Sequence, residues 1–386
     1  MKNLLIIALC LLSISMTSQE VEKIKVFSKE LSQTREISIY KPLGYEEYLN
    51  RYYDVFYVFD AQASAFPKYV SALSEILQGD SHKGALVVGI SATYIENPVY
   101  ARNHDFLPED FDITDQGSYG NQNKFLAYVK NEVIPYVEDN YRTRRHRTAI
   151  GHSLGGSFVI HSLVNDPTLF DNYIAISPNL SYKEERLAKS LEDFDFNQFK
   201  GSKFIYLSHS EENDEQKWKG WKSANQRAYK VLNEIPENSN VQVLVEQFPN
   251  EDHLSNFGTS VNSALRKYFA TILPQQHAEF SDESYSITIR AKVPNENDEL
   301  FITGNQEVLG NWIPEVLKMN KISAFQREIK LSLKDMAEFK FTRGSWDKDA
   351  WVKSANGFNN FNSVIRPKEG QTYSFEIETY SDRMGN

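Results

Sequence analysis

Residues 148–156 read TAIGHSLGG, a short apolar strand followed by Gly-x-Ser-x-Gly and the start of an apolar helix. The strand ends at Ile150 and the helix begins at Leu154, so Ser153 occupies the sharp turn between them. Glycines on both sides let strand and helix approach closely, an arrangement that exposes a nucleophilic serine on an elbow. The helix N-terminus then offers N–H groups to an oxyanion. The alternative interpretation is a tight turn with an incidental serine.

Strands and helices alternate on both sides of this elbow. Residues 54–59 (DVFYVF) form a continuous apolar run, which is typical of a strand buried on both faces of a parallel sheet. A hairpin is expected over residues 21–42. Further strands are expected at residues 85–90, 173–177, 204–208 and 241–248, and helices at residues 69–77, 125–140, 154–164, 218–234 and 257–273. This alternation predicts a doubly wound, mostly parallel α/β sheet with its active site at the carboxyl ends of the strands.

The helical period stops at Pro274, and the remaining chain has a different pattern. Short alternating runs at residues 285–293, 299–304, 326–333 and 338–343 are separated by Asn, Gly, Asp and Pro turns. Such spacing predicts a small all-β sandwich of about 100 residues. We therefore divide the chain into an α/β domain over residues 20–274 and a β-sandwich domain over residues 279–386.

The first residues have the character of an export signal. Lys2 precedes an apolar run at residues 4–12 and a polar, small-residue exit, so residues 1–19 are expected to be a cleaved signal peptide rather than a membrane span. The mature chain would be secreted or periplasmic. The single cysteine, Cys10, lies inside this segment, so the mature chain would have no thiol chemistry and no thiolate metal site.

The charge balance restricts the partners of the chain. The 386 residues carry 42 Lys and Arg against 52 Asp and Glu, a formal net charge of −10. Nucleic acids and anionic membranes are bound through clustered basic residues, so neither partner is expected. Neutral or small partners are expected instead, and no metal or organic cofactor is required by the chemistry of the serine motif.

A serine hydroxyl needs a general base, which in turn needs a carboxylate to orient it. In this type of sheet the chain order is Ser, then Asp or Glu, then His. His161, His209 and His253 lie between the serine and the all-β region. His253 occupies the loop between the last predicted strand and the last helix and is the preferred base. His209, which ends a strand, is the rival, and His161 lies within the helix after the serine.

The acid is expected in the acidic run at residues 210–215, which follows the strand at residues 204–208. Most residues of such a run form a solvated loop in any protein. One of them can nevertheless hold the imidazole tautomer. Glu212 is the first choice, and Glu211 and Asp214 are the alternatives.

Several stretches together resemble the esterase family that includes enterochelin esterase-like proteins, esterase D and feruloyl esterases. These are residues 32–60, residues 102–108 (RNHDFLP), the serine motif and Ser177-Pro178. The resemblance covers roughly residues 22–273 and implies an α/β-hydrolase fold with Ser153 as nucleophile and His253 as base. It also implies an oxyanion hole built from the N–H of Leu154 and of a residue near Ala61 or Gln62, of which we take Gln62. Residues 60–62 read Asp-Ala-Gln where the family more usually has Asp-Gly.

The all-β region resembles the starch-binding module of family 20. The resemblance rests on residues 301–305 (FITGN), residues 309–312 (LGNW) and residues 339–346 (FKFTRGSW). Sugars stack their C–H faces on flat indoles and bond to polar side chains. The resemblance implies Trp312 and Trp351 as stacking residues and Lys340 as a donor, with Trp346 as a further platform. The alternative is that Trp312 and Trp346 are core residues of the sandwich.

These patterns predict a secreted serine carboxylesterase that hydrolyses carbohydrate or phenolic acyl esters, with its C-terminal module bound to a polysaccharide such as a starch-like glycan. One alternative is a siderophore trilactone esterase of the enterochelin type. Another is a glycan-binding protein whose hydrolase domain is inactive.

Overall fold

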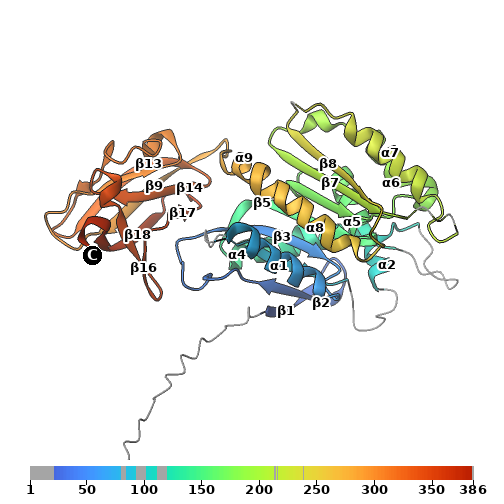
Figure 1. The fold of residues 1–386 in the computed structure, drawn as a ribbon. Helices are drawn as coiled ribbons and strands as arrows, with labels where there is room; N and C mark the ends of the chain where they lie inside the picture. The colour runs from blue at the N-terminus through green and yellow to red at the C-terminus, as the bar shows by residue number, and fades with distance from the viewer. Residues whose placement is uncertain are drawn as a thin grey trace, which may run out of the picture.

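The computed structural model describes residues 21–79, 84–92, 101–110, 120–212, 214, 216–237 and 239–384. The expected signal peptide, residues 1–19, lies outside the described residues. Figure 1 shows two bodies, a larger one of helices around a sheet and a smaller one of strands, coloured orange to red. The larger body contains the elements from Val21 to His277, and the smaller one contains the strands from Ser284 onward.

The larger body is built on one eight-stranded sheet with the order β1-β2-β4-β3-β5-β6-β7-β8. β1 and β2 form the predicted hairpin and join β4 antiparallel, and every other neighbouring pair is parallel. The strands are β1 (Val21–Ser28), β2 (Gln33–Tyr40), β3 (Tyr53–Phe59), β4 (Leu86–Ile90), β5 (Thr143–His152), β6 (Asn172–Ile176), β7 (Lys203–Ser210) and β8 (Val241–Phe248). The predicted α/β fold with a large central sheet is confirmed.

Helices cover both faces of the sheet because its central strands are apolar on both faces. All residues of β3 are buried: Phe56 and Val58 face one layer, and Tyr57 and Phe59 face the other. One layer holds α1 (Ala65–Gln78), α8 (Asn256–Lys267) and α9 (Leu273–His277). The other helices are α2 (Ala101–Phe106), α3 (Gln122–Tyr128), α4 (Ile134–Asn140), α5 (Leu154–Asn165), α6 (Tyr182–Glu192) and α7 (Trp221–Asn233). The helices α2 and α6 had not been expected from the sequence.

The last helix of this body continues past its predicted end at Leu273. A π-helical turn over Tyr268–Ile272 precedes Pro274, and the chain stays helical to His277. The same arrangement occurs at Pro135, which follows the π-helical turn Val129–Val133. A proline clashes with the carbonyl four residues earlier in an α-helix, and the wider π turn relieves that clash. Proline alone is therefore no reliable sign of a domain boundary in this chain.

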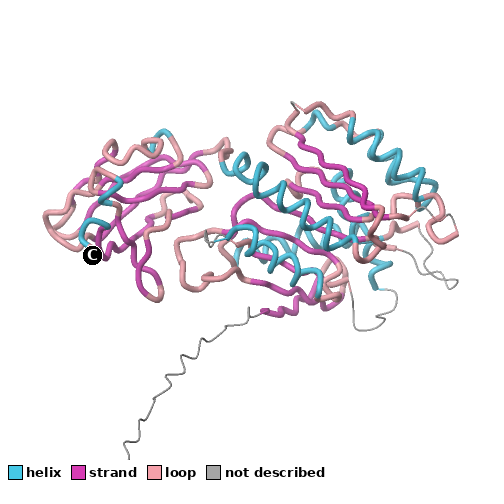
Figure 2. The backbone as a smooth tube through the Cα atoms, in the orientation of Figure 1, coloured by secondary structure: helices cyan, strands magenta, loops and turns pink. Residues whose placement is uncertain are grey.

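The smaller body contains two sheets, of order β11-β10-β14-β17 and β12-β13-β9-β18-β15-β16. Figure 2 shows it as strands and loops with short helical turns. Aromatic residues from both sheets, Phe339, Phe341 and Phe375, meet in its core. Its strands are β9 (Ser284–Lys292), β10 (Phe301–Gly304), β11 (Leu317–Lys318), β12 (Asn320–Lys321), β13 (Gln326–Lys334), β14 (Ala337–Thr342), β15 (Ala350–Ser354), β16 (Gly357–Asn359), β17 (Ser363–Ile365) and β18 (Thr372–Tyr380).

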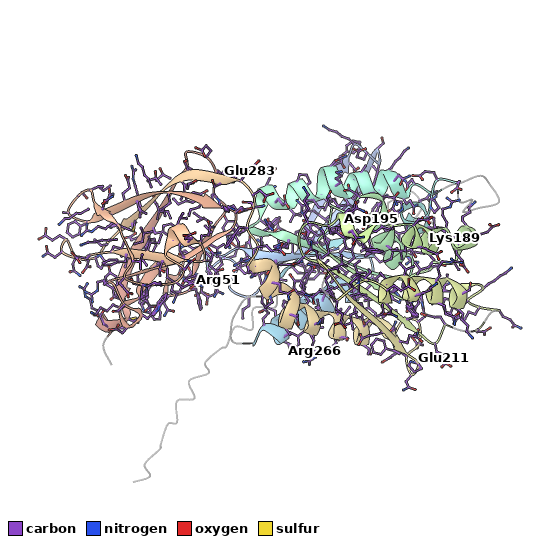
Figure 3. The ribbon with its side chains drawn as sticks, turned by 90° about the horizontal axis from the view of Figure 1, so that it is seen from above. Arg51, Lys189, Asp195, Glu211, Arg266 and Glu283 are labelled. Atoms are coloured by element: carbon purple, nitrogen blue, oxygen red, sulfur yellow. The ribbon has the colours of Figure 1, made fainter. Side chains whose placement is uncertain are left out.

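The two bodies meet at the amino ends of the parallel strands. Arg144, near the start of β5, pairs with Glu338 of β14 at 3.1 Å. Arg51, labelled at the boundary in Figure 3, lies with its guanidinium 3.7 Å from the ring centre of Phe361. A cavity of about 520 Å³ is lined by residues of both bodies. The β domain therefore packs at the end of the sheet opposite to the carboxyl ends of its strands.

No helix within the described part of the chain is both long and apolar enough to cross a membrane.

Candidate active site

The serine elbow has the strained geometry that its sequence predicts. Ser153 has φ of 58° and ψ of −123°, a backbone conformation that is rare for a residue other than glycine. A Cβ on Gly151 would clash with the carbonyl oxygen of Gly155, and a Cβ on Gly156 would lie 3.0 Å from that of Ile176. The glycines are therefore required by the close packing of β5, β6 and α5. Ser153 directly precedes Leu154, so it lies at the positive end of α5.

The structure brings together His253 and Glu212, the residues predicted to be base and acid. The Nδ1 of His253 lies 2.7 Å from Oε1 of Glu212. Glu212 follows β7, and His253 lies in the loop between β8 and α8. Because Nδ1 donates to the carboxylate, Nε2 is left as the basic nitrogen. The ring of His152, the residue before the serine, lies 4.7 Å from that of His253, which places the pair beside the elbow.

The structure separates Glu212 from its two sequence alternatives. Glu212 is buried, with 2% of its surface exposed. Glu211 and Asp214 are exposed, and Glu211 points away from the body in Figure 3. Burial alone would raise the pKa of Glu212, but hydrogen bonds from His253, Ser177 and Ser210 hold it below its usual range. Glu212 is therefore the ionised carboxylate that can stabilise a protonated His253.

The rival histidines are bound elsewhere. The Nδ1 of His209 lies 2.6 Å from the hydroxyl of Tyr229, and its Nε2 lies 3.3 Å from the carbonyl oxygen of Pro178. His161, within α5, bonds to Asn123 of α3 and to Asn165 at the end of α5. Burial lowers the pKa of each of these two histidines to about 4, so both are neutral at pH 7. In each of these two rings, both nitrogens have hydrogen-bond partners. Neither ring is therefore available as a general base.

His152 has a role that the sequence did not suggest. Its Nε2 lies 2.5 Å from the carbonyl oxygen of His253. Burial, together with the nearby His253, lowers the pKa of His152 to about 4. The neutral ring can therefore donate Nε2–H to that carbonyl and hold the loop of the catalytic base against the elbow. The only sequence signal was its place inside the serine motif.

Two tryptophans pack on the imidazole of His253 and had not been assigned to the site. The ring centre of Trp218 lies 4.6 Å from that of His253, and that of Trp221 lies 5.5 Å away. The two indoles also contact each other, with centres 4.8 Å apart. They shield one side of the imidazole from water, which strengthens its bond to Glu212. Trp218 lies between β7 and α7, and Trp221 is the first residue of α7. The sequence predicted a helix over residues 218–234 but not its contact with His253.

Two backbone N–H groups fit the expected oxyanion hole. Among the described residues, neither Leu154 N–H nor Gln62 N–H has a hydrogen-bond acceptor. The other candidate, Ala61, donates its N–H to the carbonyl of Ile90 at 3.1 Å, so that group is already used. The geometry thus favours Gln62 over Ala61.

The residues expected to bind sugar lie in the β domain, away from the serine elbow. The Lys340 ammonium pairs with Asp349 at 3.1 Å and lines the cavity between the two bodies. Trp351 is half-buried, and its Nε1–H donates to Ser381. Trp312 is half-buried in a turn with φ of 62°, whereas Trp346 is 45% exposed. Trp346 is therefore the most open of the three indoles.

No group of three or more metal-ligating side chains is found within the described ranges.

A largely parallel sheet with a serine elbow and a histidine–carboxylate pair at its carboxyl end defines a serine hydrolase of the α/β-hydrolase type. Residues 28–288 match the family described as "Putative esterase". The chain belongs to this family. The sequence-based expectation of a carboxylic ester hydrolase is thereby confirmed at the level of the family.

The chain is similar to two siderophore esterases. It is 27% identical over 191 residues to the ferri-bacillibactin esterase of Bacillus subtilis, covering 47% of this chain and 66% of that protein. It is 28% identical over 144 residues to the siderophore enterobactin esterase of Emericella nidulans, covering 33% of this chain and 47% of that one. Less than two thirds of either relative is therefore spanned.

A solved structure supports the fold. The crystal structure of the BES protein from Bacillus cereus superposes with a TM-score of 0.54 at 24% identity, covering 69% of this chain and 97% of that one.

Proposed function

We propose that this chain is a serine carboxylesterase that hydrolyses the ester bonds of a siderophore. The observation that carries the reaction is the 2.7 Å contact between His253 and Glu212 beside the strained serine elbow. The names of the two similar siderophore esterases support the substrate class. This substrate was the alternative in our sequence interpretation, and it now has more support than a carbohydrate or phenolic ester.

The reaction follows from the positions of the groups. Ser153 Oγ attacks the ester carbonyl while Nε2 of His253 takes the hydroxyl proton. Glu212 stabilises the imidazolium that forms, and the N–H groups of Leu154 and Gln62 hold the negative oxygen. The alkoxide then leaves with the proton from His253, which gives an acyl-serine. Water attacks this acyl group while His253 takes a proton from that water, and His253 then passes this proton to Ser153 Oγ as the carboxylic acid departs.

Export and glycan binding remain part of the proposal. A signal over residues 1–19 would bring the enzyme to the periplasm or outside the cell, where siderophores are encountered. The β domain could hold the enzyme on a glycan through the exposed Trp346, and because it packs at the amino ends of the strands it would act as a tether rather than as a wall of the catalytic pocket.

The test is a comparison of esters with wild-type protein and Ser153→Ala. We expect turnover of 4-nitrophenyl acetate that falls at least about 10³-fold in the variant, as loss of a nucleophile does. A cyclic siderophore trilactone should have a higher kcat/KM than methyl ferulate or acetylated xylan. A higher value for either of those esters would restore the first interpretation. Glycan binding without any serine-dependent turnover would favour an inactive binding protein.

A further inference from the structure

The loop after β3 runs beside the serine elbow. β3 pairs in parallel with β5, with Val58 opposite Ile150, so Asp60 leaves the sheet next to the serine. A Cβ on Gly155 would lie 3.1 Å from Oδ2 of Asp60, which places this carboxylate at the start of α5. Asp60 is 3% exposed and has φ of 63°. A buried residue in the left-handed region persists only where its surroundings hold it there.

Two side chains donate hydrogen bonds to the Asp60 carboxylate. Arg102 of α2 donates from Nε at 3.0 Å and from Nη2 at 2.8 Å, one bond to each oxygen. The Nε2 of Gln62 donates to Oδ1 of Asp60 at 2.7 Å. The Oε1 of Gln62 accepts from the N–H of Ala92 at 3.0 Å. The Asp60 carboxylate thus connects the loop after β3 to α2, and Gln62 extends this network to the segment after β4.

The backbone of this loop is fixed on both sides of Gln62. Ala61 N–H donates to Ile90 at 3.1 Å, and Ala63 N–H donates to the carbonyl of Asp60 at 2.9 Å. Within the described residues, the Gln62 N–H between them has no acceptor. A donor held by its neighbours and left open can stabilise a developing oxyanion without reorganising.

We propose that Asp60, clamped by Arg102, and the side chain of Gln62 are positioning residues that aim the Gln62 N–H at the oxyanion. This inference rests on the proposed esterase function and goes beyond it, because it assigns a task to three side chains that do not react. Removing the clamp should let the strained loop relax. A displacement of about 1 Å at a catalytic donor already lowers the rate strongly.

The first test is Asp60→Asn, which keeps the size of the side chain and tolerates positive φ. With 4-nitrophenyl acetate we expect kcat to fall about 10- to 100-fold and KM to change less than about twofold, since the donor acts in the transition state. Gln62→Ala, at an exposed position, should give a loss of the same kind if Asp60→Asn fails to fold. Asp110→Asn is the matched control, because the carboxylate of Asp110 also accepts two hydrogen bonds from one arginine, Arg186, on the surface.

A double variant separates positioning from direct action of Arg102. If Arg102 acts through Asp60, Arg102→Ala should add almost nothing to Asp60→Asn. If Arg102 touches the substrate itself, the two losses should multiply and KM should rise, which would overturn the proposal. Unchanged kcat in Asp60→Asn and Gln62→Ala, with serine-dependent turnover in the wild type, would also overturn it. A wild type without serine-dependent turnover would instead reject the proposed function.

Discussion

The two ends of the central sheet differ in how they hold polar groups. At the carboxyl ends, three residues that directly follow a strand have a positive φ, between 43° and 63°. They are Asp60, Ser153 and Ser177. At the amino ends, ordinary backbone carries ion pairs that reach the following domain, such as Arg144 with Glu338 and Arg145 with Glu279. Of the two ends, the carboxyl end therefore has the three strained positions, and the amino end has the ion pairs that reach the next domain.

The difference indicates that one end of the sheet serves catalysis and the other serves the stability of the domain junction. Strained positions orient an oxygen or an N–H group toward a reacting atom and contribute nothing to stability by themselves. Partly buried ion pairs hold two bodies together and have no part in bond making. Changes at the carboxyl end should therefore alter rates, whereas changes at the amino end should alter stability.

The largest effect is expected from the base. His253→Ala should lower kcat for 4-nitrophenyl acetate at least about 10³-fold, because it removes the imidazole that we propose takes the proton of Ser153. His209→Gln should stay within about tenfold, since the two ring nitrogens of His209 face Tyr229 and Pro178. Steady-state kinetics on both variants decides the matter, with circular dichroism as a check on folding. A larger loss in the His209 variant would assign the base to His209.

The candidate catalytic residues could be proposed from the sequence because chain order and local pattern point to them. Ser153 needed its flanking glycines, and His253 was favoured by its loop between the last strand and helix. Glu212 could not be distinguished from Glu211 by pattern, since both are acidic and adjacent. The two residues differ in burial: Glu212 is 2% exposed, whereas Glu211 is an exposed residue. Burial depends on how the segment after β7 folds back, which the pattern does not show.

Other features depended on tertiary packing and left no signal in the sequence. Trp218 and Trp221 contact His253 only because α7 returns beside β7. The helix continuing through Pro274 required a π turn that hydrophobic periodicity does not show. Lys340, expected to face a sugar, lines the cavity toward Arg51 because the β domain packs on the amino ends of the strands. Domain placement is set by such surface contacts rather than by local pattern.

A second effect concerns stability against pH. Burial lowers the pKa values of His152, His161 and His209 to about 4, below the unfolded value of 6.5. The stability that these neutral histidines contribute is fully present above pH 6.5 and is lost as the pH falls toward 4. In that range the histidines of the unfolded chain are protonated, whereas those of the folded chain stay neutral. We expect a loss of about 4 kcal/mol between pH 7.5 and 5.5, about 1.3 kcal/mol from each histidine, measured by urea unfolding. His161→Gln should remove about a third of it. Equal stability at both pH values would contradict the prediction.

The smallest effect is expected at the domain junction, and it completes the comparison of the two ends. Glu338 accepts from Arg144 at 3.1 Å and from Asn362 at 2.7 Å, and both charged side chains are less than a fifth exposed. Glu338→Gln keeps the size but removes the charge, which should cost about 1–2 kcal/mol of unfolding free energy.

The matched control is Glu328→Gln, whose partner Arg290 is half exposed, with an expected cost below about 0.5 kcal/mol. Both variants should keep kcat and KM for 4-nitrophenyl acetate within about twofold, because neither pair lies at the carboxyl end of the sheet. A fall in kcat in Glu338→Gln alone would show that the junction is coupled through the strands to the serine elbow. In that case the β domain would influence catalysis, and the division of the sheet into a reacting end and a joining end would be wrong.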